Sequence, residues 1–360
     1  MRTLVATLGM AALTSVQAAA SEVETSAGPM QITAMAEGLE EPWGLAFLPD
    51  GGFLVTERDG RLRRYPGGDS LTGLPEVFAK GQGGLLDVLV PRDFTSSGTV
   101  FLTYAMPVAG GAVTAVGKGQ LTDDGLTGFA PIWQAPDPMR GGRHFGARLV
   151  EAADGTLYLA TGERGTGPDG LQAQDPQRGE GKVIALLRDG EPAITQNGWL
   201  PGVISLGHRN PQGAALDGEG QLWLVEHGAQ GGDELNRITP GANYGWPVIA
   251  FGENYGGGQI GEGTEKVGMA QPVSYWDPSI APSGLMIHSG AGVAEWSGDF
   301  FTGSLKFDYL SRLDPEAGFA EERISAPETG RVRDVRQAPD GSIWFLSVSN
   351  GAVYRMAPRS

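Results

Sequence analysis

The sequence contains no cysteine, and it has only four histidines among its 360 residues. No disulfide can therefore stabilise the fold, and no thiolate can bind a metal. The motifs H-E-x-x-H and G-x-S-x-G and the Walker phosphate loop are absent as well. The glycine-rich segment GQGGLLD (81–87) is not followed by a helical pattern, so it is not a dinucleotide fingerprint. These absences disfavour transition-metal, serine-hydrolase and NAD chemistry.

Positive charge is also scarce, because 26 Lys and Arg stand against 42 Asp and Glu, for a formal net charge of −16. There is no run of Lys or Arg and no basic helix, so we expect neither nucleic acid nor an anionic membrane surface as a partner. After the first 20 residues, no apolar stretch is long enough to cross a bilayer. An acidic protein can still bind an anionic ligand where a few arginines converge.

The first 20 residues, MRTLVATLGMAALTSVQAAA, carry one cation, Arg2, then an apolar stretch over about residues 3–13 and a series of small residues. This layout is typical of a secretory signal peptide with an A-x-A type cleavage site near residues 18–20. We therefore expect residues 1–20 to be removed, and residues 21–360 to form a single periplasmic or secreted domain. The alternative is an uncleaved, buried helix.

Glycine is abundant, with 58 residues, beside 24 prolines and 40% hydrophobic residues. This composition, without a short period, is typical of a turn-rich folded protein. One unit recurs, in which two runs of alternating apolar and polar residues flank a turn that carries Asp and Gly. Its copies lie at residues 43–65, 147–165, 213–228 and 332–356. Helical periodicity is almost absent. Self-similar antiparallel units of this kind predict an all-β protein, a β-propeller.

The copies are unevenly spaced, so we expect long loops between strands at residues 110–131, 165–179 and 251–264. No linker divides the chain. The copies alone do not determine the number of blades, and a β-sandwich or a β-helix remains an alternative.

Histidines and arginines supply the first candidates for chemistry. His144 lies between glycines in RGGRHFGARL, where the backbone can approach a ligand and the imidazole can act as a general base. The alternative is an ordinary turn histidine. His208, Arg209 and Asn210 in SLGHRNPQG form either an anion clamp or a polar loop cap, because Arg can bind a carboxylate bidentately. His288 follows the apolar GLMI and is expected to be structural.

Acidic residues and late cations supply the second set. Asp233 and Glu234 stand in EHGAQGGDE beside glycines with accessible carbonyl groups, and such oxygen ligands suit calcium. The alternative is a solvated acidic turn. Lys306, Arg331 and Arg333 are candidates for a local positive pocket, and the alternative for each of them is an ordinary surface cation.

Taken together, these segments resemble one family. GQGGLLD, GRHFGARLV, AQDPQRGEGKVIAL, GHRNPQG, DELNRITPGANYGWP, DPSIAPSG, GSLKFDYL and RVRDVRQAPDGSIW occur in the same order as in the soluble quinoprotein glucose and aldose sugar dehydrogenases. The resemblance covers roughly residues 41–355 and is stronger to the shorter, aldose sugar branch. It implies a six-bladed propeller of four-stranded antiparallel blades that uses pyrroloquinoline quinone (PQQ) and calcium.

The resemblance also implies roles for single residues. His144 corresponds to the base that takes the proton of the sugar C1 hydroxyl as hydride moves to the quinone, and Gln82 corresponds to a sugar contact. Arg209 and Asn210 would lie beside the quinone oxygens, where Arg209 stabilises developing negative charge. Contacts to the PQQ carboxylates and ring are implied for Lys306, Arg331, Arg333 and Ser279.

Two calcium sites are implied in the same way. The carbonyl groups of Gly228 and Ala229 correspond to ligands of a calcium that acts as a Lewis acid on the cofactor. Glu234 and the Tyr244 carbonyl correspond to a second, structural site, with Asp233 as a weaker candidate. Arg143 departs from the glucose enzymes, which have an aspartate before the base, so sugar specificity does not follow from the resemblance.

The expected function is oxidation of the C1 hydroxyl of an aldose to the lactone, with electrons passed to an acceptor that the sequence does not identify. The oligomeric state is open, with a monomer favoured. One alternative is a calcium-dependent propeller lactonase, which leaves Lys306, Arg331 and Arg333 without a role. The other is a non-catalytic propeller that binds a glycan or a protein, which leaves His144 without one.

Overall fold

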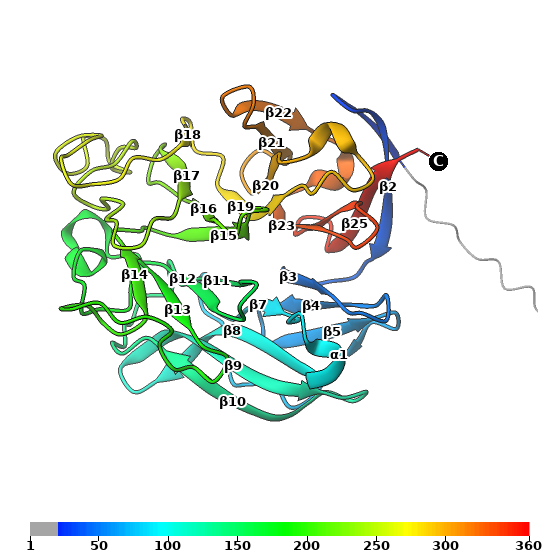
Figure 1. Ribbon diagram of the computed structural model, residues 1–360, viewed down its shortest axis with the longest axis horizontal. Coiled ribbons are helices and arrows are strands. Elements are labelled where there is room, and N and C mark those ends of the chain that lie inside the picture. Colours follow the sequence, from blue (N-terminus) through cyan, green and yellow to red (C-terminus); the bar gives the residue numbers. More distant parts are fainter. Residues whose placement is uncertain (1–20, 360) are drawn as a thin grey trace, which may run out of the picture.

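The computed structural model describes residues 21–359, and these residues form six antiparallel sheets arranged as blades around a central axis (Figure 1). The predicted six-bladed β-propeller is confirmed. The predicted signal peptide, residues 1–20, lies outside the described part of the chain. No helix within residues 21–359 has the length and apolar character needed to cross a membrane.

Blades one to three follow one another along the chain, and each is a four-stranded sheet. The first contains β3 (Pro42–Phe47), β4 (Phe53–Glu57), β5 (Arg61–Tyr65) and β6 (Asp69–Ser70). The second contains β7 (Leu85–Leu89), β8 (Thr99–Val108), β9 (Gly111–Leu121) and β10 (Leu126–Gln134), with the short helix α1 (Phe94–Ser97) between β7 and β8. The third contains β11 (Gly146–Glu151), β12 (Leu157–Thr161), β13 (Lys182–Leu186) and β14 (Val203–Leu206).

Blades four to six complete the ring. The fourth contains β15 (Pro211–Leu216), β16 (Leu222–Glu226), β17 (Asp233–Arg237) and β18 (Ser274–Trp276). The fifth contains β19 (Pro282–Ile287), β20 (Phe300–Ser304), β21 (Leu310–Asp314) and β22 (Ala320–Ile324). The sixth has five strands, β1 (Ser21–Thr25), β2 (Gly28–Ala36), β23 (Val332–Gln337), β24 (Ile343–Ser347) and β25 (Ala352–Pro358). Short 3-10 turns lie at Gly167–Asp169, Leu171–Ala173, Ala294–Trp296 and Pro327–Thr329.

The repeated sequence unit corresponds to the first strands of a blade. In the first copy, β3 and β4 pair across a turn in which Asp50 accepts a hydrogen bond from the Gly52 amide at 2.9 Å. The adjacent Gly51 has φ +86°, a conformation that glycine adopts without strain. Side chains of neighbouring blades then pack on both faces of β4, so all five of its residues are buried.

One expected loop is a hairpin instead. Residues 110–131 were predicted to be a loop, but they contain β9 and most of β10, which pair with each other. The alternation is obscured by glycines within β9. A Cβ at Gly117 would lie 2.4 Å from the Phe129 ring, so the glycine makes room for an aromatic side chain of the next strand. Residues 165–179 and 251–264 contain no named strand, as predicted.

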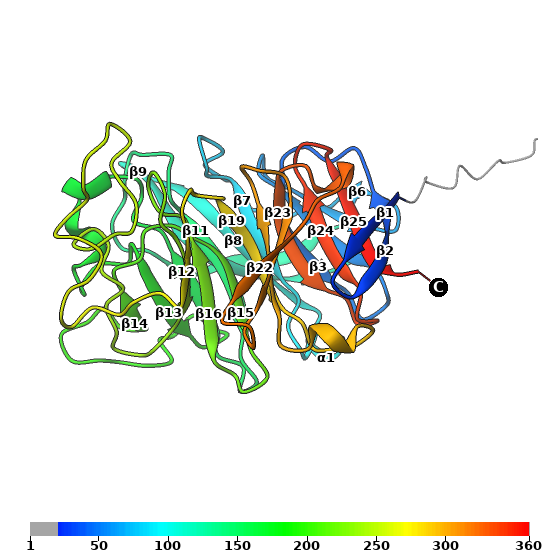
Figure 2. The ribbon, with the colours of Figure 1, turned by 90° about the horizontal axis from the view of Figure 1, so that it is seen from above.

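The two ends of the described chain close the ring within one blade. Strand β2 pairs with β25 from Met30 opposite Pro358 to Ala36 opposite Val353 (Figure 1). Figure 2, a view turned by 90°, also shows β1 and β2 beside β25. Met30 and Ile32 point into the core of this blade and are each 1% exposed.

Closure through β2 predicts an unequal response of two neighbouring residues. Ile32→Ala should lower the free energy of unfolding by about 2–4 kcal/mol, because it leaves a cavity in the core of the closing blade. Gln31 is exposed on the opposite face of β2, and Gln31→Ala should change the free energy by less than about 0.5 kcal/mol. Urea denaturation measures both, and equal effects would contradict a closing role for the buried face of β2.

Candidate active site

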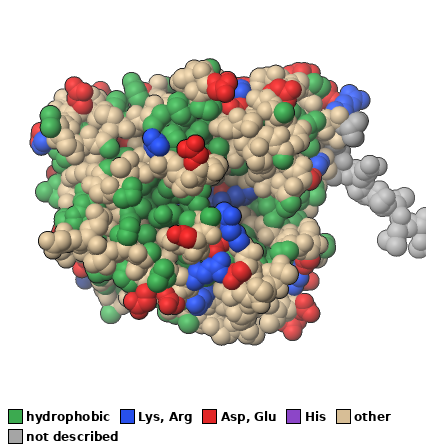
Figure 3. Space-filling model, viewed as in Figure 1, with side chains coloured by type: hydrophobic (Ala, Val, Ile, Leu, Met, Phe, Trp, Pro, Cys, Tyr) green, Lys and Arg blue, Asp and Glu red, His purple; other side chains and the backbone are tan. Residues whose placement is uncertain are grey.

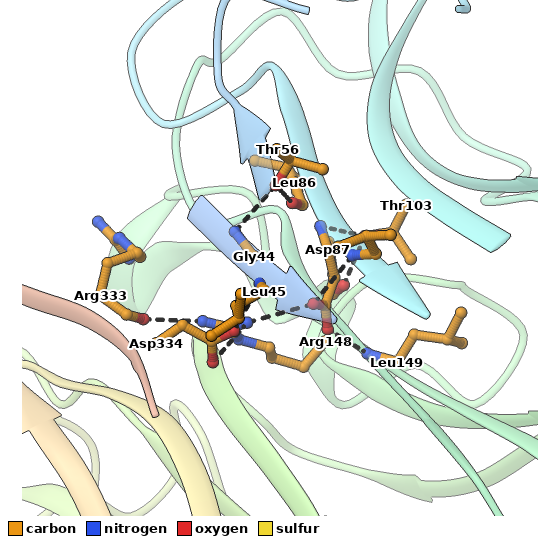
Figure 4. A network of polar contacts seen from close by, with 12 residues as sticks. Gly44, Leu45, Thr56, Leu86, Asp87, Thr103, Arg148, Leu149, Arg333 and Asp334 are labelled. Atoms are coloured by element: carbon orange, nitrogen blue, oxygen red, sulfur yellow. Dashed lines mark hydrogen bonds and ion pairs between the residues drawn. The ribbon is translucent and has the colours of Figure 1, made fainter. Parts of the chain in front are cut away.

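A buried network of ion pairs crosses the propeller axis (Figure 4). Arg148 on β11 lies 3.3 Å from a carboxylate oxygen of Asp87 on β7 and 3.1 Å from one of Asp334 on β23. Arg336 contacts the same two carboxylates at 3.1 and 3.0 Å. Burial raises the pKa of Asp87, although both arginines oppose the shift. The two negative charges and the two positive charges thus neutralise one another where the inner strands meet.

Hydrogen bonds extend this network to the remaining blades. The amide of Leu45 on β3 donates to Asp334 at 3.0 Å, and Arg148 Nε donates to the Gln212 carbonyl on β15 at 2.7 Å. The carbonyl of Arg333 accepts bonds from Arg148 at 2.9 Å and from the Ser283 hydroxyl on β19 at 2.6 Å. All six innermost strands therefore take part in one polar layer, which we call the axial plug.

A cavity of about 430 Å³ lies on the axis, and Arg333, whose carbonyl belongs to the plug, lines it. Figure 3 shows Lys and Arg side chains around a hollow near the centre of one face. The cavity brings together five of the predicted site residues, namely Gln82, Asn210, Lys306, Arg331 and Arg333. The sequence did not indicate four further lining residues, Glu41, Trp43, Arg58 and Gln212.

Three cations of this cavity lack acidic partners, whereas the fourth, Arg58, pairs with Glu41 on the cavity wall. Within residues 21–359, no carboxylate forms an ion pair with Lys306, Arg331 or Arg333. Arg333 donates to Gln212 Oε1 at 2.9 Å and to the Ser283 hydroxyl at 3.2 Å. Burial, with Arg148, Arg331 and Arg58 nearby, lowers the pKa of Arg333. In a protein of charge −16, such a cluster favours an anionic ligand.

His144 lies beside the cavity, before β11, and is 8% exposed. Its amide donates to Gln82 Oε1 at 2.7 Å, so the two predicted substrate-side residues hold each other. Its Nδ1 lies 2.5 Å from Glu163 Oε1. The carboxylate accepts a hydrogen bond from the Nδ1–H group, which leaves Nε2 as the ring's proton acceptor. This arrangement is that of an oriented general base.

The electrostatics keep this base neutral. Burial lowers the pKa of His144, the Glu163 carboxylate opposes the shift, and Arg209 and Arg143 add to it. Burial tends to raise the pKa of Glu163, but hydrogen bonds from His144 and Thr166 outweigh it and the pKa is lowered. At neutral pH the pair is therefore an imidazole beside a carboxylate.

Glu163 is a site residue that the sequence reasoning missed. Gly146 pairs with Thr161 at the start of the β11–β12 hairpin. Extending that register by two residues on each side brings position 144 opposite position 163. A signal was therefore available in the hairpin register, although no motif spacing connects the two residues.

Arg209 is anchored by a buried relay. Its amide donates to Glu226 at 2.7 Å, and His208 joins the other oxygen of Glu226 at 2.8 Å and the Ser205 hydroxyl at 2.9 Å. The pattern is that of a Ser–His–Glu triad, but Ser205 and His208 are 0% exposed and Glu226 is 3% exposed. No substrate can reach that hydroxyl, so the relay supports Arg209 and is not a serine-hydrolase triad.

The predicted calcium loop surrounds a small hollow of about 20 Å³, lined among others by Gly228, Glu234, Tyr244 and Glu226. Burial and the neighbouring Glu226 raise the pKa of Glu234 to about 8. A cation in the hollow would relieve both effects, so these residues fit one. Residues 21–359 contain no cluster of three or more His, Asp or Glu side chains suited to a metal. A cation in this hollow would therefore need oxygen ligands other than side-chain clusters, and Gly228 and Tyr244, whose carbonyl groups are expected ligands, border the same hollow.

Asp233 and Ser279 organise this loop. The Asp233 carboxylate accepts bonds from the Gly228 amide at 2.8 Å, the Ser279 hydroxyl at 3.0 Å and the Ala281 amide at 2.7 Å. Ser279 in turn accepts a bond from the Gly231 amide at 3.1 Å. Neither side chain lines the main cavity, although Ala281 does.

Comparison with known sequences agrees with this architecture. The model of the Glucose / Sorbosone dehydrogenase family matches residues 39–355. Aldose sugar dehydrogenase YliI of Escherichia coli (strain K12) is 38% identical over 350 residues, 92% of this chain and 94% of that protein. Quinoprotein glucose dehydrogenase B of Acinetobacter calcoaceticus is 27% identical over 308 residues, 75% of this chain and 63% of that protein.

Solved structures agree as well. The apo-form of the soluble aldose sugar dehydrogenase from Escherichia coli has a TM-score of 0.85 and 37% identity, covering 92% of this chain and 100% of that chain. The PQQ-bound form of the aldose sugar dehydrogenase from Streptomyces coelicolor has a TM-score of 0.75 and 28% identity, covering 91% of this chain and 98% of that chain. The fold is therefore that of the sugar dehydrogenase propellers. The chain belongs to the glucose/sorbosone dehydrogenase family, as the resemblance predicted.

Gly162 packs closely against the backbone of His144. A Cβ at Gly162 would lie 2.2 Å from the His144 carbonyl oxygen, so Gly162→Ala should lower the free energy of unfolding by about 1–3 kcal/mol. Gly218 has open space around it, and Gly218→Ala is the control, expected within about 0.5 kcal/mol of the wild type. Denaturant titration decides, and an unchanged Gly162→Ala protein would mean that the His144 loop moves freely.

Proposed function

We propose that this protein is a periplasmic or secreted PQQ- and calcium-dependent dehydrogenase that oxidises the C1 hydroxyl of aldose sugars to lactones. The observation that carries the proposal is the axial cavity, in which three cations without acidic partners, Lys306, Arg331 and Arg333, lie beside an oriented, neutral histidine. Neither a lactonase nor a glycan-binding propeller needs both features in one place.

The cavity fits a planar tricarboxylate. PQQ carries three carboxylates, and Lys306, Arg331 and Arg333 supply three cations on the cavity wall. When bound, PQQ supplies the two-electron acceptor that the protein's own side chains lack. Asn210 lines the same cavity and Arg209 lies next to it in sequence, which suits hydrogen bonds to quinone oxygens. We propose the Ser279 hydroxyl as a further contact to PQQ.

The protein's own residues would then handle the sugar proton. Gln82 orients the sugar while its carbonyl oxygen holds the His144 amide. The free Nε2 of His144 accepts the proton of the C1 hydroxyl, and Glu163 stabilises the resulting imidazolium. Arg209 stabilises negative charge that develops on the quinone oxygens. The electron acceptor is unidentified, and we propose a monomer.

Calcium is proposed at the loop of residues 228–244. Gly228 and Ala229 would offer carbonyl groups to a cofactor-side ion, which would polarise the quinone as a Lewis acid. Glu234 and the Tyr244 carbonyl would hold a structural ion, with Asp233 as the organiser of both. The raised pKa of Glu234 supports a resident cation.

One experiment tests the proposed function. Purified mature protein is supplied with PQQ and calcium, and dye reduction is followed with glucose and other aldoses. We expect PQQ binding by absorbance and turnover with at least one aldose. Absence of turnover with every aldose, together with absence of PQQ binding, would sink the proposal.

The base assignment predicts a loss that spares cofactor binding. His144→Ala should lower kcat by about 10²- to 10⁴-fold and leave the PQQ dissociation constant nearly unchanged. Because the pKa of His144 is lowered from 6.5, wild-type kcat/KM should stay level at pH 7 and fall only below pH 6.5, as Nε2 takes a proton. The remote His288→Gln serves as a control, and near-normal turnover of His144→Ala would show the assignment to be wrong.

Calcium should stabilise the protein through Glu234. At about 100 times its dissociation constant, the ion should add about 2.7 kcal/mol to the free energy of unfolding. Glu234→Gln should abolish this increment, whereas Glu219→Gln, in an exposed turn of the same blade, should keep it. Thermal unfolding with calcium and with a chelator measures the effect. The site assignment fails if both variants respond as the wild type does.

A further inference from the structure

A buried arginine follows the acidic partner of the base. Arg164 is 3% exposed, and it forms no ion pair with a carboxylate in the described part of the chain. Its guanidinium instead donates to three carbonyl groups, those of Ala112 at 2.6 Å, Gly141 at 2.6 Å and Arg143 at 3.2 Å. Burial lowers the pKa of Arg164 to about 10, so it remains charged at neutral pH.

The Arg164 guanidinium contacts the residues on both sides of His144 in the sequence. Arg143 precedes His144 and Phe145 follows it. The guanidinium bonds the carbonyl of the first and lies over the ring of the second, with 3.7 Å from its central carbon to the ring centroid. The bond to Ala112 on β9 also ties the His144 loop to the second blade.

The backbone that Arg164 holds has unfavourable dihedral angles. His144 has φ +46° and Arg164 has φ +71°, in the left-handed region that residues with a side chain rarely adopt. The Arg164 amide donates to the His144 carbonyl at 3.1 Å, so the two unusual residues face each other. Such conformations persist only where surrounding contacts determine them.

We propose that Arg164 is the positioning residue of the catalytic base, holding the segment 141–145 so that the His144 imidazole stays aligned between Glu163 and the cavity. The proposal rests on the proposed function, because it takes His144 as the base. Lysine cannot replace this arginine, since one ammonium cannot donate to three carbonyl groups in a plane and also cover an aromatic face.

Kinetics of Arg164→Lys and Arg164→Ala test the proposal. Both variants should bind PQQ with a dissociation constant within about threefold of the wild type and lose at least about tenfold in kcat, with little change in KM. Millimolar guanidinium ion should restore part of the activity of Arg164→Ala, because it can occupy the vacated place between the carbonyl groups. Unchanged kcat in both variants would overturn the proposal.

Arg312→Ala is the matched control. Arg312 is also a buried guanidinium, but it pairs with Asp299 and Glu322 in the fifth blade. Its loss should lower thermal stability while kcat stays within about twofold and guanidinium ion has no effect. If Arg312→Ala loses kcat to the same extent as the Arg164 variants, general destabilisation explains both and the proposal fails.

A second readout is independent of turnover. With only four histidines in the chain, 15N NMR can follow the His144 ring, assigned by its absence in His144→Ala. In Arg164→Lys and Arg164→Ala the pKa of His144 should rise towards 6.5, because the released loop exposes the ring to water. An unchanged His144 titration would overturn the proposal. A wild type without aldose oxidation refutes the proposed function, whereas this titration still decides the role of Arg164 in the loop.

Discussion

The balanced charges on the propeller axis are the constraint on which the rest of the structure depends. Two carboxylates and the Arg148 guanidinium are buried together, with the partly exposed Arg336 beside them. Removing these charges from water is offset only when each of them is paired. Each comes from an innermost strand, with Asp87 on one, Arg148 on the next and Asp334 and Arg336 on a third. The ion pairs join three blades, and the hydrogen bonds of Leu45, Gln212 and Ser283 add the other three. The whole polar layer therefore forms only when all six blades have the correct register.

The cavity and the axial plug share Arg333, because its carbonyl accepts bonds within the plug while its side chain lines the cavity. The pairing of β23 with β24 shifts register between Val332 and Asp334, so Arg333 is an extra, unpaired residue at that point. Such a bulge redirects a side chain, and here Arg333 lines the cavity while Asp334 belongs to the plug.

Much of this could be predicted from the sequence. The repeats indicated a propeller, and the cations at 306, 331 and 333 were expected to converge, as they do. The number of blades came only from resemblance, and the β9–β10 hairpin was missed because glycine replaces apolar residues where Phe129 packs. Glu163, Arg164 and Arg148 went unassigned because their partners lie across a hairpin, another blade or the axis, and no motif spacing records such pairs.

Closure by the two ends of the chain has a consequence for synthesis. Met30 and Pro358 are paired although they are 328 positions apart, so the contact that completes the ring forms after almost the whole chain has left the ribosome. Contacts of such separation form slowly. Until then, β2 presents an unpaired strand edge, the kind of surface that pairs with other chains or with a chaperone. The newborn protein is therefore most exposed to misassembly at β2.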